Sequence, residues 1–216
     1  MTLTLLGASG VALAVTKIGT DGPDSLMGTN GADNLIGKGG NDVLYALGGR
    51  DTLLGEEGKD WVLGGNEQRP LGGNKNLVGG PGNDGIRGGK GSDNLTGNSG
   101  NDLVDGGSGS DDISGGDGTD YLIDGERRGG ETDTLIGGEG NDVLGPFNGP
   151  ANRDFVTCGS GFDRVLADTE DVVAPDCEKV AVGPAAAQKL NQQLQRSGFF
   201  DRIFEGLAPS PIGPLG

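Results

Sequence analysis

The chain has 216 residues, of which 47 are Gly and 10 are Pro, and aromatic residues make up only 4%. This composition leaves too little apolar mass for an ordinary thick core, and no apolar run is long enough for a transmembrane helix, so we expect no membrane insertion. The net charge of −16 and the complete lack of His argue against nucleic-acid binding and against catalytic sites that need an imidazole. We therefore expect stability to come largely from something other than apolar burial.

The N-terminal segment has the pattern of an export signal. Residues 1–15 carry no charge, and Ala12-Leu13-Ala14 puts small residues at the positions that a signal peptidase reads. We interpret residues 1–14 as a signal peptide and expect a secreted, extracellular protein. The usual Lys- or Arg-rich start is missing, so a first pair of β-strands packed on the rest of the chain is the alternative.

From Gly19 to about residue 173 the sequence is a run of nine-residue units. The clearest block runs from Gly79 to Ile123 and reads GGPGNDGIR, GGKGSDNLT, GNSGNDLVD, GGSGSDDIS and GGDGTDYLI. Each unit opens with Gly-rich turn residues, has Asp at its sixth position and has an aliphatic residue at its eighth. A flexible acidic linker has no reason to keep an aliphatic residue at every ninth position, so this period predicts a folded repeat.

The pattern GGxGxDx(aliphatic)x resembles the nonapeptide of RTX (repeats-in-toxin) proteins, the hemolysin-type calcium-binding repeats. The resemblance implies an all-β fold, a right-handed parallel β-roll in which six residues of a unit form a turn and three form a short strand. Two units then complete one coil, and several Ca²⁺ ions lie between stacked turns. The chemistry agrees, because Ca²⁺ takes six to eight oxygen ligands and a Gly-rich turn with one Asp supplies carbonyls and a charge. The residues expected to bind metal are Asp24, Asp33, Asp42, Asp51, Asp60, Asp84, Asp93, Asp102, Asp111, Asp120, Asp133, Asp142, Asp154 and Asp163.

Two units per coil would place the odd-numbered units on one face and the even-numbered units on the other. All odd units are nine residues long, whereas the insertions, a Lys at position six and the shortened last unit all fall among the even units. We therefore expect an unbroken calcium ladder on the odd face, with up to seven ions between eight turns, and an interrupted one on the even face. The Lys is Lys75, and either its ammonium neutralises Asp51 and Asp93 or its side chain projects into solvent.

The two cysteines and the C-terminal segment are expected to close the roll. Cys158 and Cys177 are 19 residues apart, close to the 18 of one coil, which favours a disulfide over two free thiols or a redox pair. We assign residues 15–177 to the roll, 178–207 to a short C-terminal helical cap and 208–216 to a disordered tail. Leu190 and Leu194 have helical spacing, and a second apolar patch follows at 200–207. A partner-binding helix or a C-terminal export signal is the alternative to a cap.

These expectations describe a secreted calcium-binding repeat protein that folds when calcium binds, with calcium ions as its partners. The alternative is a calcium-rigidified surface adhesin or glycan-binding module, whose cell-surface or glycan partner would contact Tyr45, Trp61 and Tyr121 on the outer face. Ice binding is weaker, because the outward Thr array stops after Thr20 and Thr29.

We do not expect an enzyme. The chain has no room for a separate catalytic domain beside the repeats, and the repeat carboxylates are accounted for as calcium ligands. A carboxylate pair of the glycosidase kind among Glu67, Glu126 and Glu131 is the remaining catalytic alternative.

Overall fold

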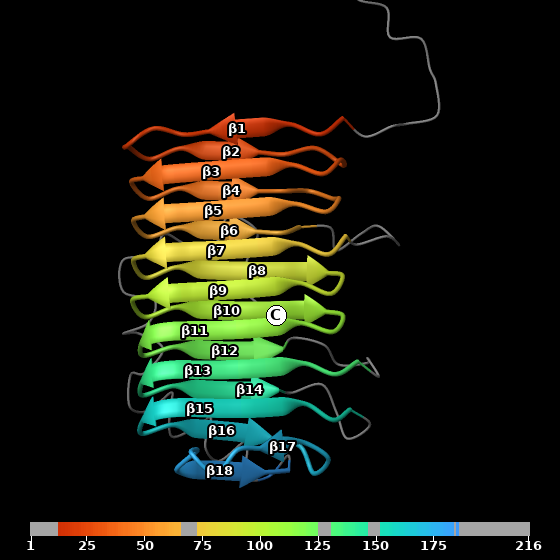
Figure 1. Ribbon diagram of the computed structural model, residues 1–216, viewed down its shortest axis with the longest axis vertical. Helices are drawn as coiled ribbons and strands as arrows, with labels where there is room; N and C mark the ends of the chain where they lie inside the picture. Colours follow the sequence, from red (N-terminus) through yellow and green to blue (C-terminus); the bar gives the residue numbers. More distant parts are fainter. Residues whose placement is uncertain (1–12, 66–72, 125–130, 147–151, 184, 186–216) are drawn as a thin grey trace, which may run out of the picture.

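The computed structural model describes residues 13–65, 73–124, 131–146, 152–183 and residue 185. These residues form two nine-stranded sheets of parallel strands, stacked coil upon coil along one axis (Figure 1). The first sheet contains β1 (Thr16–Ile18), β3 (Asn34–Gly39), β5 (Thr52–Glu57), β7 (Asn76–Pro81), β9 (Asn94–Ser99), β11 (Asp112–Gly118), β13 (Thr134–Gly140), β15 (Phe155–Gly161) and β17 (Val172–Val173). The second contains β2 (Ser25–Met27), β4 (Val43–Tyr45), β6 (Trp61–Leu63), β8 (Gly85–Lys90), β10 (Leu103–Ser108), β12 (Tyr121–Asp124), β14 (Val143–Pro146), β16 (Arg164–Ala167) and β18 (Lys179–Val182).

The register confirms that two units complete one coil. In the regular part, each residue lies opposite the one 18 positions later, as Val104 of β10 lies opposite Leu122 of β12. Where a unit carries extra residues the register is kept, so that Val62 of β6 lies opposite Ile86 of β8, 24 positions later. The insertions therefore do not shift the pairing of the described strands, and the fold is the expected all-β parallel β-roll.

Many strands are longer than the three residues expected. Strand β8 has six residues and β11 has seven. The reason is that the first turn residues of one coil also pair with those of the next, as Gly107 does with Gly89 and Ser108 with Lys90. The turns are thus held in the same register as the sheets.

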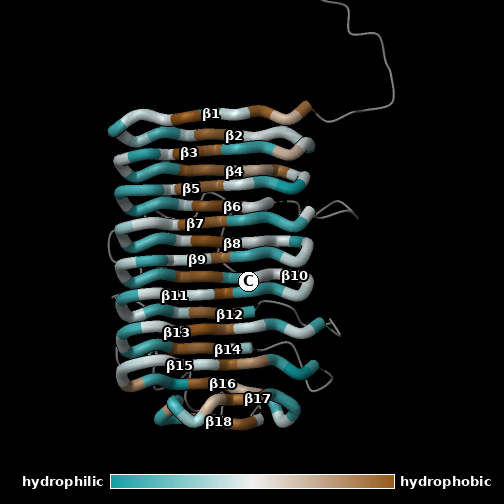
Figure 2. Tube along the Cα trace, viewed as in Figure 1, coloured by the Kyte–Doolittle hydropathy of each residue, from teal (hydrophilic) through white to brown (hydrophobic). Residues whose placement is uncertain are grey.

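The interior is one aliphatic residue deep on each sheet. Side chains alternate between the two faces of a strand, so the eighth residue of each unit points inward. Figure 2 shows these residues as a hydrophobic band along the middle of the strands, with hydrophilic turns on either side. The buried eighth-position residues are Leu35, Leu44, Leu53, Val62, Leu77, Ile86, Leu95, Val104, Ile113, Leu122, Leu135, Leu144, Val156 and Val165.

The C-terminal end of the roll differs from the expectation in one part. The segment assigned to a helical cap from residue 178 begins instead with strand β18, whose residue Val180 pairs with Val165 of β16. The open edge of β16 is thus covered by one more strand of the same sheet. The rest of the expected cap, apart from the first residues after β18, lies outside the described residues, as do the tail 208–216 and nearly all of the segment 1–14.

The expected disulfide is present. Cys158 of β15 and Cys177, which precedes β18, are bonded with a Cα–Cα distance of 5.2 Å. Cys158 is fully buried among the aliphatic residues, so the bridge ties the last coil to the core. No helix among the described residues is long and apolar enough to cross a membrane.

Candidate metal centres in the stacked turns

The turns stack along two edges of the roll. We call the edge with the turns of the odd units the regular edge, which lies at the left in Figure 1, and the edge with the turns of the even units the interrupted edge. On the regular edge the sixth-position residues are Asp24, Asp42, Asp60, Asp84, Asp102, Asp120, Asp142 and Asp163; on the interrupted edge they are Asp33, Asp51, Lys75, Asp93, Asp111, Asp133, Asp154 and Asp171.

One hydrogen bond repeats along both rows. The backbone N–H of Asp84 donates to Oδ1 of Asp102 at 2.8 Å, and the N–H of Asp102 donates to Oδ1 of Asp120 at 2.8 Å. On the interrupted edge the N–H of Asp93 donates to Oδ1 of Asp111 at 2.7 Å. The structure therefore brings the predicted aspartates together in two rows, and from Asp33 onward one oxygen of each predicted carboxylate accepts a hydrogen bond from the preceding coil.

The second oxygen, Oδ2, is the feature that points to a metal. In ten of these aspartates Oδ2 is buried and accepts no hydrogen bond. Burial of a charged oxygen without a donor or counterion is strongly unfavourable, so each such oxygen calls for a cation or a proton. The ten are Asp42, Asp60, Asp84, Asp102, Asp120, Asp142 and Asp163 on the regular edge and Asp51, Asp93 and Asp111 on the interrupted edge. Of these, Asp93 already has a cation beside its Oδ2, the Lys75 ammonium at 3.7 Å.

Backbone carbonyl oxygens converge on the same place. A β-carbon added to Gly97, the first residue of its turn, would collide with Oδ2 of Asp102 and would lie 2.5 Å from the carbonyl oxygen of Gly115 in the next coil. Gly is needed here because only a bare backbone allows this approach. A carboxylate oxygen beside a carbonyl oxygen, with no nitrogen or sulfur ligand, is the donor set that Ca²⁺ prefers. The residues present fit calcium.

The turn backbone is more uniform on the regular edge. In seven successive turns there, from the turn of Lys38 and Gly40 to that of Gly159 and Gly161, the second and fourth residues both have positive φ. The described part of the interrupted edge contains three such turns. The regularity of the odd units is thus confirmed in the backbone, whereas the number of ions on each edge stays a prediction.

Burial raises the pKa of these carboxyl groups. The pKa of Asp102 is raised to about 8 and that of Asp84 to about 7, first by desolvation and further by neighbouring carboxylates, while the hydrogen bond from a backbone N–H opposes the rise. On the interrupted edge the pKa of Asp111 is likewise raised to about 8, mainly by desolvation. Near neutral pH, cations and protons therefore compete for the same oxygens.

The first turn on each edge is completed by a Thr side chain. The backbone N–H and the hydroxyl of Thr20 donate to Oδ2 of Asp24 at 2.6 and 2.9 Å, and Thr29 makes the same pair of bonds to Asp33. Asp24 and Asp33, both predicted metal ligands, therefore have hydrogen-bonded Oδ2 atoms and differ from the ten described above. The same bonds direct the two Thr hydroxyls into the turns.

The rows end in different ways. On the interrupted edge, Asp133 donates its N–H to Oδ1 of Asp154 at 2.9 Å, and Asp154 donates to Oδ1 of Asp171 at 3.2 Å. On the regular edge, the N–H of Asp163 donates to Oε2 of Glu178 at 2.7 Å. Sequence reasoning missed Glu178, because it lies outside the nonapeptide pattern and reaches the row only through the fold.

Lys75 lies inside the row of the interrupted edge. Its backbone N–H donates to Oδ1 of Asp93 at 2.8 Å, as an Asp at this position would. Its side chain is fully buried, and Nζ lies 3.7 Å from Oδ2 of Asp93 and donates to the carbonyl oxygen of Lys90 at 2.9 Å. The interpretation that this side chain projects into solvent is therefore wrong.

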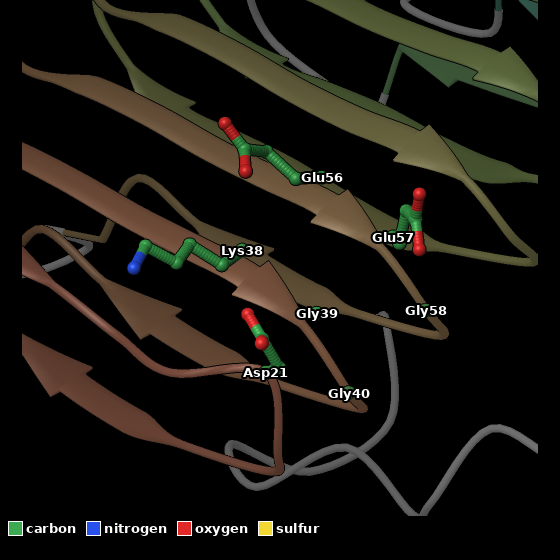
Figure 3. A pocket seen from close by; sticks show the side chains of 7 residues that line it. All are labelled: Asp21, Lys38, Gly39, Gly40, Glu56, Glu57 and Gly58. Atoms are coloured by element: carbon green, nitrogen blue, oxygen red, sulfur yellow. The ribbon is translucent and has the colours of Figure 1, made fainter.

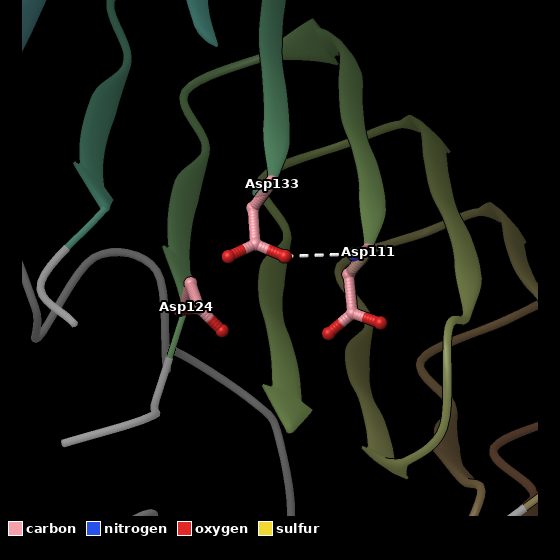
Figure 4. A group of neighbouring side chains, drawn as sticks. All are labelled: Asp111, Asp124 and Asp133. Atoms are coloured by element: carbon pink, nitrogen blue, oxygen red, sulfur yellow. Dashed lines mark hydrogen bonds between the residues drawn. The ribbon is translucent and has the colours of Figure 1, made fainter. Parts of the chain in front are cut away.

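Asp124 is a candidate ligand that sequence reasoning missed. Carboxylate oxygens of Asp111, Asp124 and Asp133 lie within 4.8 Å of one another, and all three residues are buried. In Figure 4 the Asp124 side chain points toward the other two. The signal was visible in the sequence, because Asp124 opens the unit DGERRGGETDTLI at the position where most other units have Gly.

An open hollow lies beside the first turns of the regular edge (Figure 3). The side chains that line it, Asp21, Lys38, Glu56 and Glu57, belong to the second and third positions of their turns and are exposed. This hollow is the solvent side of the turn stack and contains charges of both signs.

Of the three aromatic residues expected on the outer face, Trp61 is buried and Tyr45 and Tyr121 are half-buried. Trp61 is only 5% exposed, and its ring lies so close to Gly85 in the next coil that a β-carbon there would collide with it. The missing side chain at Gly85 leaves the room that the indole ring fills. Of the three loop acids weighed for catalysis, Glu131 is exposed, and Glu67 and Glu126 lie outside the described residues.

Comparison with known proteins agrees with this geometry. A family model of four copies of the RTX calcium-binding nonapeptide repeat matches residues 18–53, 36–67, 72–104, 87–122 and 129–144, which together span more than half of the chain. No curated protein matches the chain significantly. With stacked turns, two rows of aspartates and these matches, the chain belongs to the family of RTX calcium-binding nonapeptide repeats.

Proposed function

We propose that the protein is an extracellular calcium-binding repeat protein whose roll folds when calcium binds. The observation that carries the proposal is the set of ten buried Asp Oδ2 atoms that accept no hydrogen bond. In several of these turns, such as those of Gly37, Gly55 and Gly97, a glycine carbonyl oxygen of the next coil approaches the same space. A chain with this many buried carboxylates whose second oxygen accepts no hydrogen bond resists folding until cations neutralise them.

The binding residues act in pairs of neighbouring coils. One turn supplies an Asp Oδ2 and the next supplies a carbonyl oxygen, as Asp102 and Gly115 do on the regular edge. When bound, Ca²⁺ supplies positive charge where only oxygens meet, and this charge links consecutive coils. Binding and stacking are therefore coupled, because a site exists only when two coils are in register.

An extracellular location suits this chemistry. Extracellular calcium modules commonly have Kd values of about 10⁻⁴ to 10⁻³ M, well above cytosolic free calcium. The disulfide between Cys158 and Cys177 is of the kind that persists in oxidising compartments. Both points support export from the cell.

The test combines ion counting with circular dichroism. The calcium-free protein at pH 7.5 should lack most of the β-sheet signal, and calcium in the millimolar range should restore it while several ions per chain become bound, as measured by equilibrium dialysis and elemental analysis. Magnesium should not replace calcium, because Mg²⁺ needs a tighter octahedral site and keeps its waters. A full β-sheet signal in chelator with no bound calcium would refute the proposal.

A further inference from the structure

Two residues of the interrupted edge change the charge of the row in opposite directions. Lys75 places a cation where the pattern has Asp, and Asp124 places a carboxylate where most units have Gly. Each of the two inferences below rests on calcium binding as proposed above, and each rests on its own contacts.

The stem of Lys75 takes the place of a carboxylate oxygen. In the turn of Gly97, a β-carbon on the first glycine would meet Oδ2 of the Asp at position six. In the turn of Gly64, a β-carbon added to Gly64 would instead lie 2.7 Å from Cδ of Lys75. The aliphatic part of the side chain therefore fills the space in which a calcium ligand lies in the other turns.

The ammonium group of Lys75 contacts oxygens of the kinds that bind calcium. Nζ donates to the carbonyl oxygen of Lys90, the third residue of the next turn, and lies 3.7 Å from Oδ2 of Asp93, the sixth residue of that turn. An ammonium has a single charge and three donors, so a carbonyl and a carboxylate suit it. Both side chains are fully buried, so either charge without the other would be strongly unfavourable.

We infer that the Lys75 ammonium is a built-in replacement for a calcium ion between the turn that precedes β7 and the turn that precedes β9. This internal cation divides the calcium row of the interrupted edge into a short N-terminal part, with Asp33 and Asp51, and a longer C-terminal part that starts at Asp93. The positive charge between these two coils is thus covalently attached and does not depend on the calcium concentration, while the regular edge in the same region keeps its carboxylates, Asp60 and Asp84.

The test is the substitution Lys75→Asp, which restores the pattern of the row. This variant should bind about one more calcium ion per chain than the parent protein in equilibrium dialysis. The matched control is Lys179→Asp, which makes the same change of charge at an exposed position on β18 and should leave the ion count unchanged. Equal counts for the two variants would overturn the inference, whereas a parent protein that binds no calcium would instead refute the proposed function.

A second variant covers the case in which Lys75→Asp fails to fold. Lys75→Met keeps a stem of similar length without the charge, so it should bind no additional calcium and should leave Asp93 without its counterion. We expect its Tm in saturating calcium to fall by about 5 °C or more, and Lys179→Met to have the Tm of the parent. If Lys75→Met is as stable as Lys179→Met, the ammonium does not have the inferred role.

Asp124 carries the second inference. It extends the pair formed by Asp111 and Asp133, in which the N–H of Asp111 donates to Oδ1 of Asp133 at 2.7 Å (Figure 4). Oδ2 of Asp111 is fully buried and accepts no hydrogen bond, and the three carboxylates bring their oxygens within 4.8 Å. Three carboxylates this close repel one another, so more positive charge is needed to neutralise them than in a turn with a single carboxylate.

We propose that Asp124 makes the site between Asp111 and Asp133 the tightest calcium site of the interrupted edge. More carboxylate ligands raise calcium affinity. Asp124→Asn, which keeps the shape and removes the charge, should weaken the highest-affinity binding step by about tenfold in a chelator-competition titration. Asp124→Gly, which restores the repeat pattern, should have the same effect, while Asp112→Asn, at an exposed residue of β11, should not. If both Asp124 variants give the isotherm of Asp112→Asn, Asp124 is not a ligand.

Discussion

The two edges of the roll are built from the same nonapeptide, yet they differ in charge and in regularity. Seven aspartates on the regular edge and three on the interrupted edge have a buried Oδ2 without a hydrogen bond. Seven successive turns of the regular edge have positive φ at their second and fourth residues, whereas the interrupted edge contains a buried Lys and an additional Asp. The difference teaches that a solenoid tolerates insertions and charge changes on one edge as long as the other edge keeps the coils in register.

Removal of calcium should have the largest effect on both edges, and the effect should depend on pH. The pKa values of Asp102 and Asp111 are raised to about 8, so the calcium-free roll takes up protons on folding. Its stability is therefore greatest below the unfolded pKa of about 3.8 and is lost as the pH rises through 7 to 8. Circular dichroism from pH 4 to 9 should show a loss of β-sheet signal with rising pH in the absence of calcium, and no such loss in its presence. A calcium-free roll that is more stable at pH 8 than at pH 5 would contradict the assignment of these groups.

Loss of one carboxylate on the regular edge should cost more than loss of one on the interrupted edge. Asp102→Asn should lower the Tm in calcium by about 10 °C, because both neighbouring coils also carry an Asp with an unpaired oxygen. Asp51→Asn should lower it by about half as much, since its neighbour on one side is Lys75. Without calcium Asp102→Asn should instead raise the remaining β-sheet signal at pH 7.5, because it removes a buried charge. Calorimetry in calcium and circular dichroism without it test this reversal of sign, and equal losses for the two variants in calcium would remove the difference between the edges.

A smaller steric change separates the first glycine of a turn on the regular edge from a fourth-position glycine in the first turn of that edge. Gly97→Ala places a methyl group against Oδ2 of Asp102 and the carbonyl of Gly115, and should cost about 1–3 kcal/mol of unfolding free energy and weaken calcium binding. At Gly22 a β-carbon would meet only the Thr20 hydroxyl, at 3.9 Å, so Gly22→Ala should stay within about 0.5 kcal/mol. Denaturant titration in calcium measures both, and similar losses would mean that the close approach at Gly97 does not matter.

The smallest effect is expected at the N-terminal end, where the two edges are alike. Thr20→Val and Thr29→Val each remove a hydroxyl that donates to the Asp of the same turn. Each should cost about 1 kcal/mol, with no change in the number of bound ions. A clear difference between the two variants in denaturant titration would show that the edges already diverge in their first turns.

Periodicity made much of the fold predictable. The inward position of Leu95, the stacking of Asp84 on Asp102 and the pairing of Cys158 with Cys177 all follow from a coil of two units. The strand at Lys179–Val182 was not predicted, because the segment lies past the last unit and forms a strand only by pairing with β16.

The sequence by itself determined the period, the rows of carboxylates and the thin aliphatic core, because these depend on residue spacing within a unit and repeat at every coil. Only the tertiary structure decided that Lys75 turns inward to Asp93 and that Asp124 joins Asp111. The physical reason is that both side chains depart from the repeat, so their surroundings are set by residues of a neighbouring coil, many positions away in the chain. The repeat pattern specifies the path of the backbone, but the partner of a charged side chain that departs from the pattern depends on which residues the fold places beside it.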